Sequence, residues 1–423
     1  MKIAIQAADL DSQRIDGTRV YILNVLKYFG KLDESSDFLV YHKKNFNSEL
    51  EPPEFPNYKI IQKNSACIWT QTRFAWEIWK DKPDVLWMPM QALPIIRRKN
   101  LKTVITVHDL AFKIFPNQFT RNDLRRLNFY ADYAIKNSSK IIAVSESTKK
   151  DILKFYPEIK EDKIKVIYHG FDEGVFGKRY DNSEILDILE KYNIINKVQS
   201  SKFKVQSYSS KLKVTFKYLL YVGALQPRKN LILLVKAFER LKEKYCHSGQ
   251  RAGIQSGNKD NALDSRFRGN DKNAGDFSNL KLVLVGKPAW MAEEILERIK
   301  KSEFANDIIL AGQVGFGDLG KIYQGASAFV FPSLYEGFGI PILEAFASGV
   351  SVICANNSSL PEVAGEAALY FKNNNPQDLA IQIEKILLSE EFKKDLVSKG
   401  LLQLRKFSWE KCARETLSYL KSG

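Results

Sequence analysis

Residues 335–344, with the sequence YEGFGIPILE, place a carboxylate on either side of two glycines. Glycine lets the backbone approach a ligand closely, and the free N–H groups at the start of a helix attract anions. Glu336 lies at the mouth of the expected turn, and Glu344 lies about one turn into the helix that follows. A nucleotide sugar needs such a set, with one carboxylate for sugar hydroxyls and the other for ribose hydroxyls. An ordinary glycine turn with solvated acids is the alternative.

A second turn carries two adjacent cations. Residues 221–230, YVGALQPRKN, run from an apolar strand through a turn into a helix, and Arg228 and Lys229 lie in that turn. Adjacent basic residues before a helix are often surface charge alone. Ligands of open α/β sheets bind at the carboxyl ends of the strands, however, and two cations at such an end suit a diphosphate.

The elements that must position these residues alternate between strand and helix. Strand-like apolar runs lie at 2–7, 37–42, 84–87, 102–107, 140–144 and 164–168, and again at 218–223, 281–286, 308–311, 328–331 and 351–354. Helical periodicity appears at about 17–31, 69–80, 120–137, 146–156, 231–244, 290–301, 317–325, 340–348 and 376–388. The pattern predicts an α/β fold with two doubly wound, Rossmann-like domains in tandem, whose ligand edges form a cleft.

Composition excludes several other classes of protein. The 423 residues are 44% hydrophobic and 27% charged, which excludes a disordered or collagen-like chain. The four cysteines lie far apart without a CxxC pair, so neither a zinc module nor a disulfide framework is indicated. The first residues read as a strand rather than a signal peptide, and no apolar run approaches about 18 residues. We therefore expect a cytoplasmic protein.

The net charge of +15 is concentrated in part of the chain. Residues 97–154 hold 13 Lys and Arg against 5 Asp and Glu, and three of these basic residues, Arg121, Arg125 and Arg126, lie on the helix expected after Thr120. A solvated face is one interpretation. Attraction to anionic lipid headgroups, or to a phosphorylated acceptor, is the other, and it predicts peripheral binding to the inner face of the cell membrane. Nucleic acid is disfavoured because no recognition motif accompanies the charge.

Three further patterns bear on which kinds of site the chain can form. Trp69, Trp76 and Trp79 have roughly helical spacing, which favours a core face over an acceptor-facing one. Gly337 and Gly339 lack the third glycine of a dinucleotide site, and GxxxxGK[ST] does not occur. No two histidines have metal-ligand spacing, so we expect no metal site and no cofactor.

Taken together, EGFGIPILE, YVGALQPRKN, FVFPSLYEGFG, SSLPEVAGEAAL and HDLAFKIFP closely resemble retaining glycosyltransferases of family four. The resemblance covers residues 1–175 and 218–423. It implies the GT-B fold, two Rossmann-like domains facing across a cleft. Within the family, the chain resembles bacterial mannosyltransferases that build O-antigen and other surface polysaccharides.

The resemblance also implies a division of the chain into domains. We expect an acceptor domain at 1–175 and a donor domain at 218–405, with a C-terminal helix at about 406–423 packing back on the first. Residues 176–217 are expected to be a linker that carries the repeat KVQS…KVQS. The polar stretch 247–278 is expected to be a surface insertion in the donor domain.

On the donor side, the resemblance assigns roles to the two motifs described first. Arg228 and Lys229 match the residues that bind the donor diphosphate, and Glu344 matches the acid that binds ribose hydroxyls. Glu336, with the backbone of Gly337, Phe338 and Gly339, matches the part that holds the donor sugar and phosphate.

On the opposite side, Gly17 matches a glycine loop that approaches the donor phosphates. His108 matches a histidine near the reacting anomeric carbon, although a lone histidine at a strand end is often structural. Catalytic roles are thereby implied for His108, Glu336, Arg228 and Lys229.

The implied reaction moves a sugar, mannose favoured, from a nucleotide diphosphate sugar to a saccharide or lipid-linked acceptor. GDP-mannose is the favoured donor, and the configuration at the anomeric carbon is retained. Two alternatives remain: another GT-B enzyme, such as a sugar-nucleotide epimerase, and a non-catalytic or decayed protein that only binds nucleotide sugars.

Overall fold

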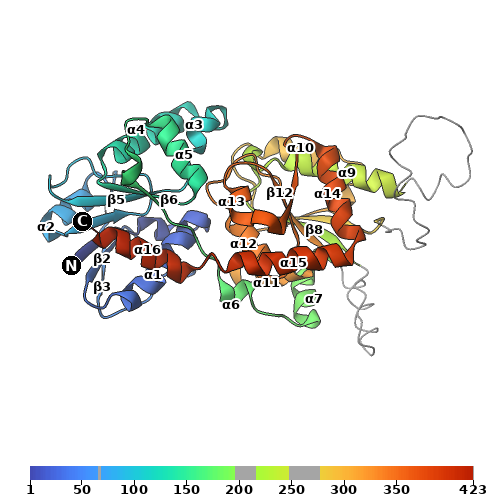
Figure 1. Cartoon of the computed structure of the whole chain (residues 1–423), viewed down its shortest axis with the longest axis horizontal. Helices are drawn as coiled ribbons and strands as arrows, with labels where there is room; N and C mark the ends of the chain where they lie inside the picture. The colour runs from blue at the N-terminus through green and yellow to red at the C-terminus, as the bar shows by residue number, and fades with distance from the viewer. Residues whose placement is uncertain (65–67, 196–215, 247–276, 423) are drawn as a thin grey trace, which may run out of the picture.

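The computed structural model describes residues 1–64, 68–195, 216–246 and 277–422. These residues form two parallel sheets, each covered by helices, that lie side by side along the molecule (Figure 1). The predicted α/β fold with two Rossmann-like domains is confirmed. The predicted repeat within 196–215, and the predicted insertion except for its last two residues, lie outside the described residues.

The N-terminal sheet has the strand order β3-β2-β1-β4-β5-β6-β7, with every neighbouring pair parallel. Its central strands are buried on both faces, as a sheet between two helical layers requires. The strands are β1 Lys2–Gln6, β2 Asp37–His42, β3 Tyr58–Gln62, β4 Val85–Met88, β5 Lys102–Val107, β6 Lys140–Ala143 and β7 Ile164–Val166. The helices are α1 Gly17–Leu32, α2 Arg73–Asp81, α3 Ala111–Ile114, α4 Arg121–Asn137 and α5 Glu146–Phe155.

The C-terminal sheet has the order β10-β9-β8-β11-β12-β13 and is also parallel. Its strands are β8 Tyr218–Val222, β9 Lys281–Val285, β10 Ile308–Gly312, β11 Ala328–Phe331, β12 Val352–Ala355 and β13 Ala368–Phe371. Its helices are α9 Leu231–Cys246, α10 Glu293–Lys300, α11 Phe316–Gly325, α12 Ile340–Ala347, α13 Leu360–Ala364, α14 Pro376–Leu388 and α15 Glu390–Leu404.

The chain passes between the domains twice. On the first passage it forms α6 Glu173–Phe176 and α7 Asn182–Lys191, and both helices contact α11 of the C-terminal domain. A capping box between Asp181 and Glu184 begins α7, so part of the range predicted as a linker is a regular helix.

On the second passage α15 leads into α16 Trp409–Lys421, which packs along α1 of the N-terminal domain (Figure 1). Lys421 Nζ lies 2.8 Å from the carboxylate of Asp33, and the Tyr419 hydroxyl donates to the carbonyl of Lys163 at 2.8 Å. The end of the described chain is therefore part of the first domain.

Candidate functional site

The two motifs singled out from the sequence meet at a cavity of about 380 Å³ between the domains. Both follow strands of the C-terminal sheet, β8 and β11, at their carboxyl ends, and His108 and Gly17 contribute from the N-terminal domain. The predicted site residues that line the cavity are Gly17, His108, Arg228, Lys229, Glu336, Gly337, Phe338 and Gly339.

The turn at Gly337 is pressed against the N-terminal domain. Its carbonyl accepts hydrogen bonds from Ser145 Oγ at 2.7 Å and from Thr148 Oγ1 at 3.2 Å. A Cβ on Gly337 would overlap the carbonyl oxygen of His108, so only glycine allows this approach. Tyr335, the first residue of the motif, adds a further hydrogen bond between the domains. Its hydroxyl donates to the carboxylate of Asp151 at 2.7 Å.

The same turn is fixed from behind by its own domain. Ser359 Oγ bonds the carbonyls of Glu336 at 3.0 Å and Phe338 at 2.5 Å. Gly339 has φ 124°, a backbone conformation that other residues rarely adopt, and it directly precedes α12. These contacts set the direction in which the first turn of α12 points.

Two helix N-termini converge on the cavity. α12 begins at Ile340 with proline in its first turn, as predicted, and α1 begins at Gly17 from the other domain. A Cβ on Gly17 would lie 3.6 Å from the side chain of Ile340, so the two helix starts are in close proximity. The two ends differ, because the side chain of Asp16 caps α1 by accepting from Arg19 N, whereas α12 has no side-chain cap. The start of α12 is therefore the end that favours an anion.

Arg228 and Lys229 form the other wall, on the short 3₁₀ turn Pro227–Lys229. Lys229 Nζ donates to Glu336 Oε1, and Arg228 donates to the carbonyl of Tyr335 at 2.8 Å. Arg228 also lies 3.8 Å from the carboxylates of both Glu336 and Asp109.

Burial and mutual pairing shift the pKa values of this group in opposite directions. Burial alone would raise the pKa of Glu336, but Lys229 and Arg228 offset it and the pKa is lowered. Burial lowers the pKa of Lys229, and the neighbouring Glu336 opposes that change. Two cations thus border the cavity, with Glu336 paired to Lys229 and both Glu336 and Asp109 lying 3.8 Å from Arg228.

His108 is held as a neutral ring. Its Nε2 lies 2.8 Å from the carbonyl of Pro89, and since a carbonyl only accepts, Nε2 carries the proton. Burial lowers the pKa of His108, which favours the neutral form and leaves Nδ1 as an acceptor. The ring packs edge-on against Tyr21, with centroids 5.0 Å apart.

Sequence reasoning missed a second histidine, His169, which also lines the cavity. It stacks on Tyr21 at 4.8 Å and lies 5.6 Å from the ring of His108. Within the described part of the chain neither ring nitrogen has a hydrogen-bond partner, and burial lowers its pKa well below the ordinary value. Its position just after β7, at the same sheet edge as His108, is the signal that could have found it.

Glu344 differs from the other predicted residues. Among the described residues around the cavity it is not a lining residue, and its carboxylate instead accepts a hydrogen bond from the Tyr323 hydroxyl at 3.0 Å. Burial raises its pKa to about 7.

A second cavity of about 630 Å³ continues from the first. The two share Arg14, Ile15 and the residues 222–224 that follow β8. The second is lined by apolar as well as polar groups, among them Pro288, Trp290 and Val314. The combined space has a charged end and a more apolar end, as a sugar diphosphate joined to a nucleoside would require.

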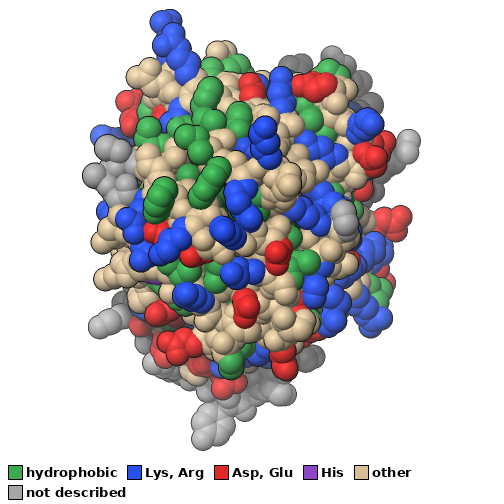
Figure 2. Space-filling view, turned by 90° about the vertical axis from the view of Figure 1, so that its left-hand side faces the viewer, with side chains coloured by type: hydrophobic (Ala, Val, Ile, Leu, Met, Phe, Trp, Pro, Cys, Tyr) green, Lys and Arg blue, Asp and Glu red, His purple; other side chains and the backbone are tan. Residues whose placement is uncertain are grey.

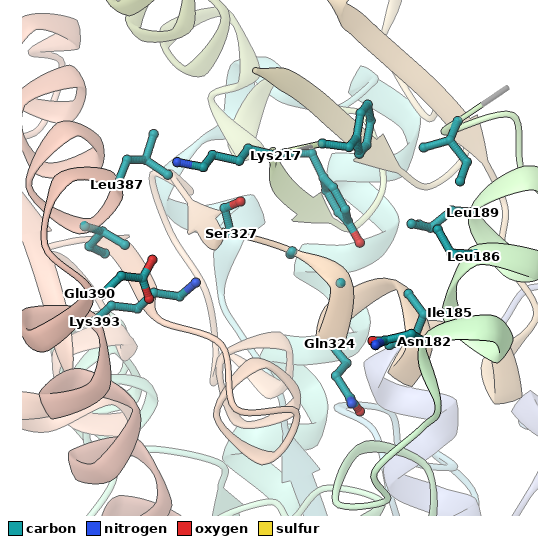
Figure 3. A pocket seen from close by; sticks show the side chains of 16 residues that line it. Asn182, Ile185, Leu186, Leu189, Lys217, Gln324, Ser327, Leu387, Glu390 and Lys393 are labelled. Carbon is teal, nitrogen blue, oxygen red and sulfur yellow. The ribbon is translucent and has the colours of Figure 1, made fainter. Parts of the chain in front are cut away.

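Another cavity, of about 370 Å³, lies away from this site (Figure 3). Side chains of α7, α14 and α15 line it, together with Lys217 and Tyr218 at the amino end of β8. It contains none of the predicted site residues. Ligands of open α/β sheets bind at the opposite, carboxyl edge, so it carries no functional assignment.

Comparison with known families agrees with this architecture. A family model described as Glycosyltransferase Family 4 matches residues 15–174, and one described as Glycosyl transferases group 1 matches residues 202–402. Between them the two matches take in both domains, one for each side of the cavity.

Individual relatives are more distant. The chain is 26% identical to O-antigen chain mannosyltransferase B of Escherichia coli over 320 residues, which is 76% of this chain and 70% of that protein. The chain is also 26% identical to the serotype-specific mannosyltransferase WbdA of the same organism, but the match spans only 32% of that protein.

Solved structures share the fold. The crystal structure of Anabaena HepE in complex with UDP and glucose matches with a TM-score of 0.68 at 14% identity, covering all of both chains. WaaG, a glycosyltransferase involved in lipopolysaccharide biosynthesis, matches with a TM-score of 0.67 at 14% identity, also over all of both chains. With both halves matched by their family models and the whole fold shared, the chain belongs to the GT-B glycosyltransferases of family four.

Proposed function

We propose that the protein transfers a sugar, mannose favoured, from a nucleotide diphosphate sugar to a saccharide or lipid-linked acceptor of a cell-surface polysaccharide. The observation that carries the proposal is the meeting of two cations and the uncapped start of α12 in one interdomain cavity. This arrangement suits a diphosphate, and the adjoining cavity has room for a nucleoside. The similarity to O-antigen mannosyltransferases supports mannose and polysaccharide synthesis.

The anomeric configuration is retained in this proposal. A double-displacement route would need a carboxylate nucleophile beside the anomeric carbon. From the N-terminal domain, His108 lines the cavity as a neutral ring, which is a poor match for that role. Two carboxylates of that domain, Asp16 and Asp109, also line the cavity, but both are already engaged. Asp16 is paired with Arg19, and Asp109 accepts from the backbone N–H of Ala111 at 3.0 Å and lies 3.8 Å from Arg228. We therefore favour a front-face route, in which the leaving phosphate accepts the proton of the attacking acceptor hydroxyl.

Charge develops on the leaving phosphate as the glycosidic bond breaks. Arg228, Lys229 and the N–H groups at the start of α12 are positioned to stabilise it, in a site where burial strengthens each interaction. Lys229 is paired with Glu336 when no donor is bound, so donor binding would draw the cation from the carboxylate toward the phosphate. Glu336 would then be free to accept a hydroxyl of the donor sugar.

A donor panel tests the proposal. GDP-mannose and several UDP- and ADP-sugars are incubated with the protein and a saccharide acceptor, and the released nucleotide is measured. The expected result is release of GDP from GDP-mannose, together with a product that NMR shows to have the same anomeric configuration as the donor. Donor binding without turnover would instead favour the non-catalytic alternative, and a new sugar nucleotide without transfer would favour an epimerase.

A further inference from the structure

Two tryptophans of α2 are exposed to solvent. The core interpretation is confirmed for Trp69, which is buried, and is wrong for Trp76 and Trp79, which are 65% and 48% exposed. The helix begins only at Arg73, and its buried face is made by Phe74, Ala75 and Ile78. The tryptophans three residues apart therefore lie on the opposite, outward face.

Two exposed isoleucines lie on a loop that is tied to the start of this helix. Ile95 and Ile96 are exposed on the loop after β4, and Ile96 is 69% exposed. Gln71, just before α2, ties that loop to the helix: its side-chain amide donates to Leu93 O at 3.0 Å and accepts from Ile95 N at 2.8 Å. We call Trp76, Trp79, Ile95 and Ile96 the tryptophan face. Figure 2, which views this end of the molecule, shows apolar side chains gathered with Lys and Arg beside them.

The charge around the tryptophan face is positive. Residues 68–100 contain six basic residues and three acids. Each acid is already engaged: Glu77 pairs with Arg73 at 2.7 Å, Asp81 accepts from the Tyr41 hydroxyl at 2.7 Å, and Asp84 accepts from the Lys2 backbone at 2.7 Å. The basic residues are Arg73, Lys80, Lys82, Arg97, Arg98 and Lys99.

The face is connected to the catalytic cavity through one loop. That loop starts at Pro89, whose carbonyl holds His108, and reaches the surface at Ile95 and Ile96. Arg97 then anchors it to α4 by donating to the Tyr133 hydroxyl at 2.7 Å. A molecule whose apolar part lay at the face could present its polar end toward His108.

We propose that the tryptophan face inserts into the headgroup region of an anionic lipid bilayer and so brings the acceptor side of the cleft to a lipid-linked acceptor. Tryptophan rings and aliphatic side chains are favoured at this depth, and the surrounding cations attract anionic headgroups. Among the described helices none is long and apolar enough to cross a membrane. Only the nature of the acceptor rests on the proposed function, since lipid binding needs neither donor nor transfer.

The arginines of α4 lie in the first two turns of the helix to which Arg97 anchors the loop. Phe129 is exposed on that helix, one turn beyond Arg125 and Arg126. The tryptophan face supplies insertion, which salt does not screen, and the α4 arginines supply attraction, which salt does screen. The two contributions can therefore be separated by experiment.

The test uses the full chain and vesicles containing anionic phosphatidylglycerol, with a bromine-labelled lipid that quenches nearby tryptophan fluorescence. The double variant Trp76→Ser, Trp79→Ser removes the apolar part without changing charge. The paired substitution of Leu388→Ser with Leu402→Ser is the matched control, because these leucines are 50% and 57% exposed on α14 and α15 of the C-terminal domain. The triple variant Arg121→Ser, Arg125→Ser, Arg126→Ser removes charge alone. Thermal unfolding confirms that each variant is folded.

The expected result is a tenfold or greater loss of vesicle affinity in the double variant, together with loss of the bromolipid quenching. The control should bind and be quenched like the unchanged protein, and the triple variant should bind with a shallower salt dependence. Equal binding of the double variant and the control would overturn the proposal. A change in oligomeric state by sedimentation, with vesicle binding unaltered, would show instead that the face pairs two copies of the chain. Binding with no glycosyl transfer would contradict only the proposed function.

Discussion

Replacing Glu344 by glutamine should make the stability of the protein less dependent on pH. Burial raises the pKa of this carboxyl from 4.5 to about 7, and Asp172 adds to the effect while the Tyr323 hydroxyl opposes it. Between these two values the folded protein binds the proton more tightly than the unfolded chain, so stability falls as pH rises. The difference of about 2.5 pKa units corresponds to about 3 kcal/mol, at about 1.4 kcal/mol for each unit. Glutamine has no proton to lose and escapes this cost.

Denaturant unfolding at pH 5, 6, 7 and 8 measures the effect. The free energy of unfolding of Glu344→Gln, relative to the unchanged protein, should increase by about 2–3 kcal/mol from pH 5 to pH 8, because a small part of the full effect already lies below pH 5. Glu297→Gln is the control, because Glu297 is 71% exposed on α10, and its relative stability should stay constant. Parallel pH profiles for the unchanged protein and Glu344→Gln would refute the reasoning. The predicted ribose contact is tested separately: Glu344→Ala should weaken donor binding by about 1–3 kcal/mol in calorimetry.

Four other perturbations test the site. Gly337→Ala should lower stability by about 1–3 kcal/mol in thermal or denaturant unfolding, because its Cβ would overlap the carbonyl of His108; an unaltered midpoint would show that the domains do not meet there. Arg228→Ala and Lys229→Ala should reduce kcat more than donor affinity, since the phosphate charge is greatest in the transition state, and an equal loss in both would mean that the cations only bind. The unchanged protein should lose stability as the pH falls from 7 to 5, because burial lowers the pKa of His169 and protons therefore bind the unfolded chain first. His169→Phe should make this loss of stability smaller. Activity should persist in EDTA, because side-chain cations already face the phosphates; loss restored by magnesium or manganese would contradict this.

Most of the fold could be predicted from local pattern because its strands are buried on both faces. β1, β5, β8 and β9 are continuous apolar runs, and the turn and helix signals between them are clear. β3 and β13 were not predicted. Each lies at the edge of its sheet. Most side chains of β3 are exposed and two of the four in β13 are only partly buried, so neither strand has the buried apolar run that marks those four strands.

The two motifs that hold most of the predicted site residues follow strands, and parallel strands end at one edge, which is why the sequence could place those residues at one cavity. The contacts that could not be predicted form between segments that are far apart in the sequence. Ser145 and Ser359 fix the 337 turn from opposite sides, and nothing near them in sequence marks that role. The exposure of Trp76 and Trp79 was missed for a related reason: periodicity identifies a shared face of a helix but not whether another element covers it.

The docking of α16 on α1 has a consequence for how the protein is made. A ribosome synthesises this helix only after the whole C-terminal domain, yet its buried side chains, Cys412, Ala413, Leu417 and Leu420, complete the N-terminal one. The first domain to emerge is thus the last to be finished, and an apolar strip of α1 stays uncovered in the nascent chain meanwhile. Premature release, or proteolytic cleavage after α15, would leave that strip exposed to chaperones and to aggregation.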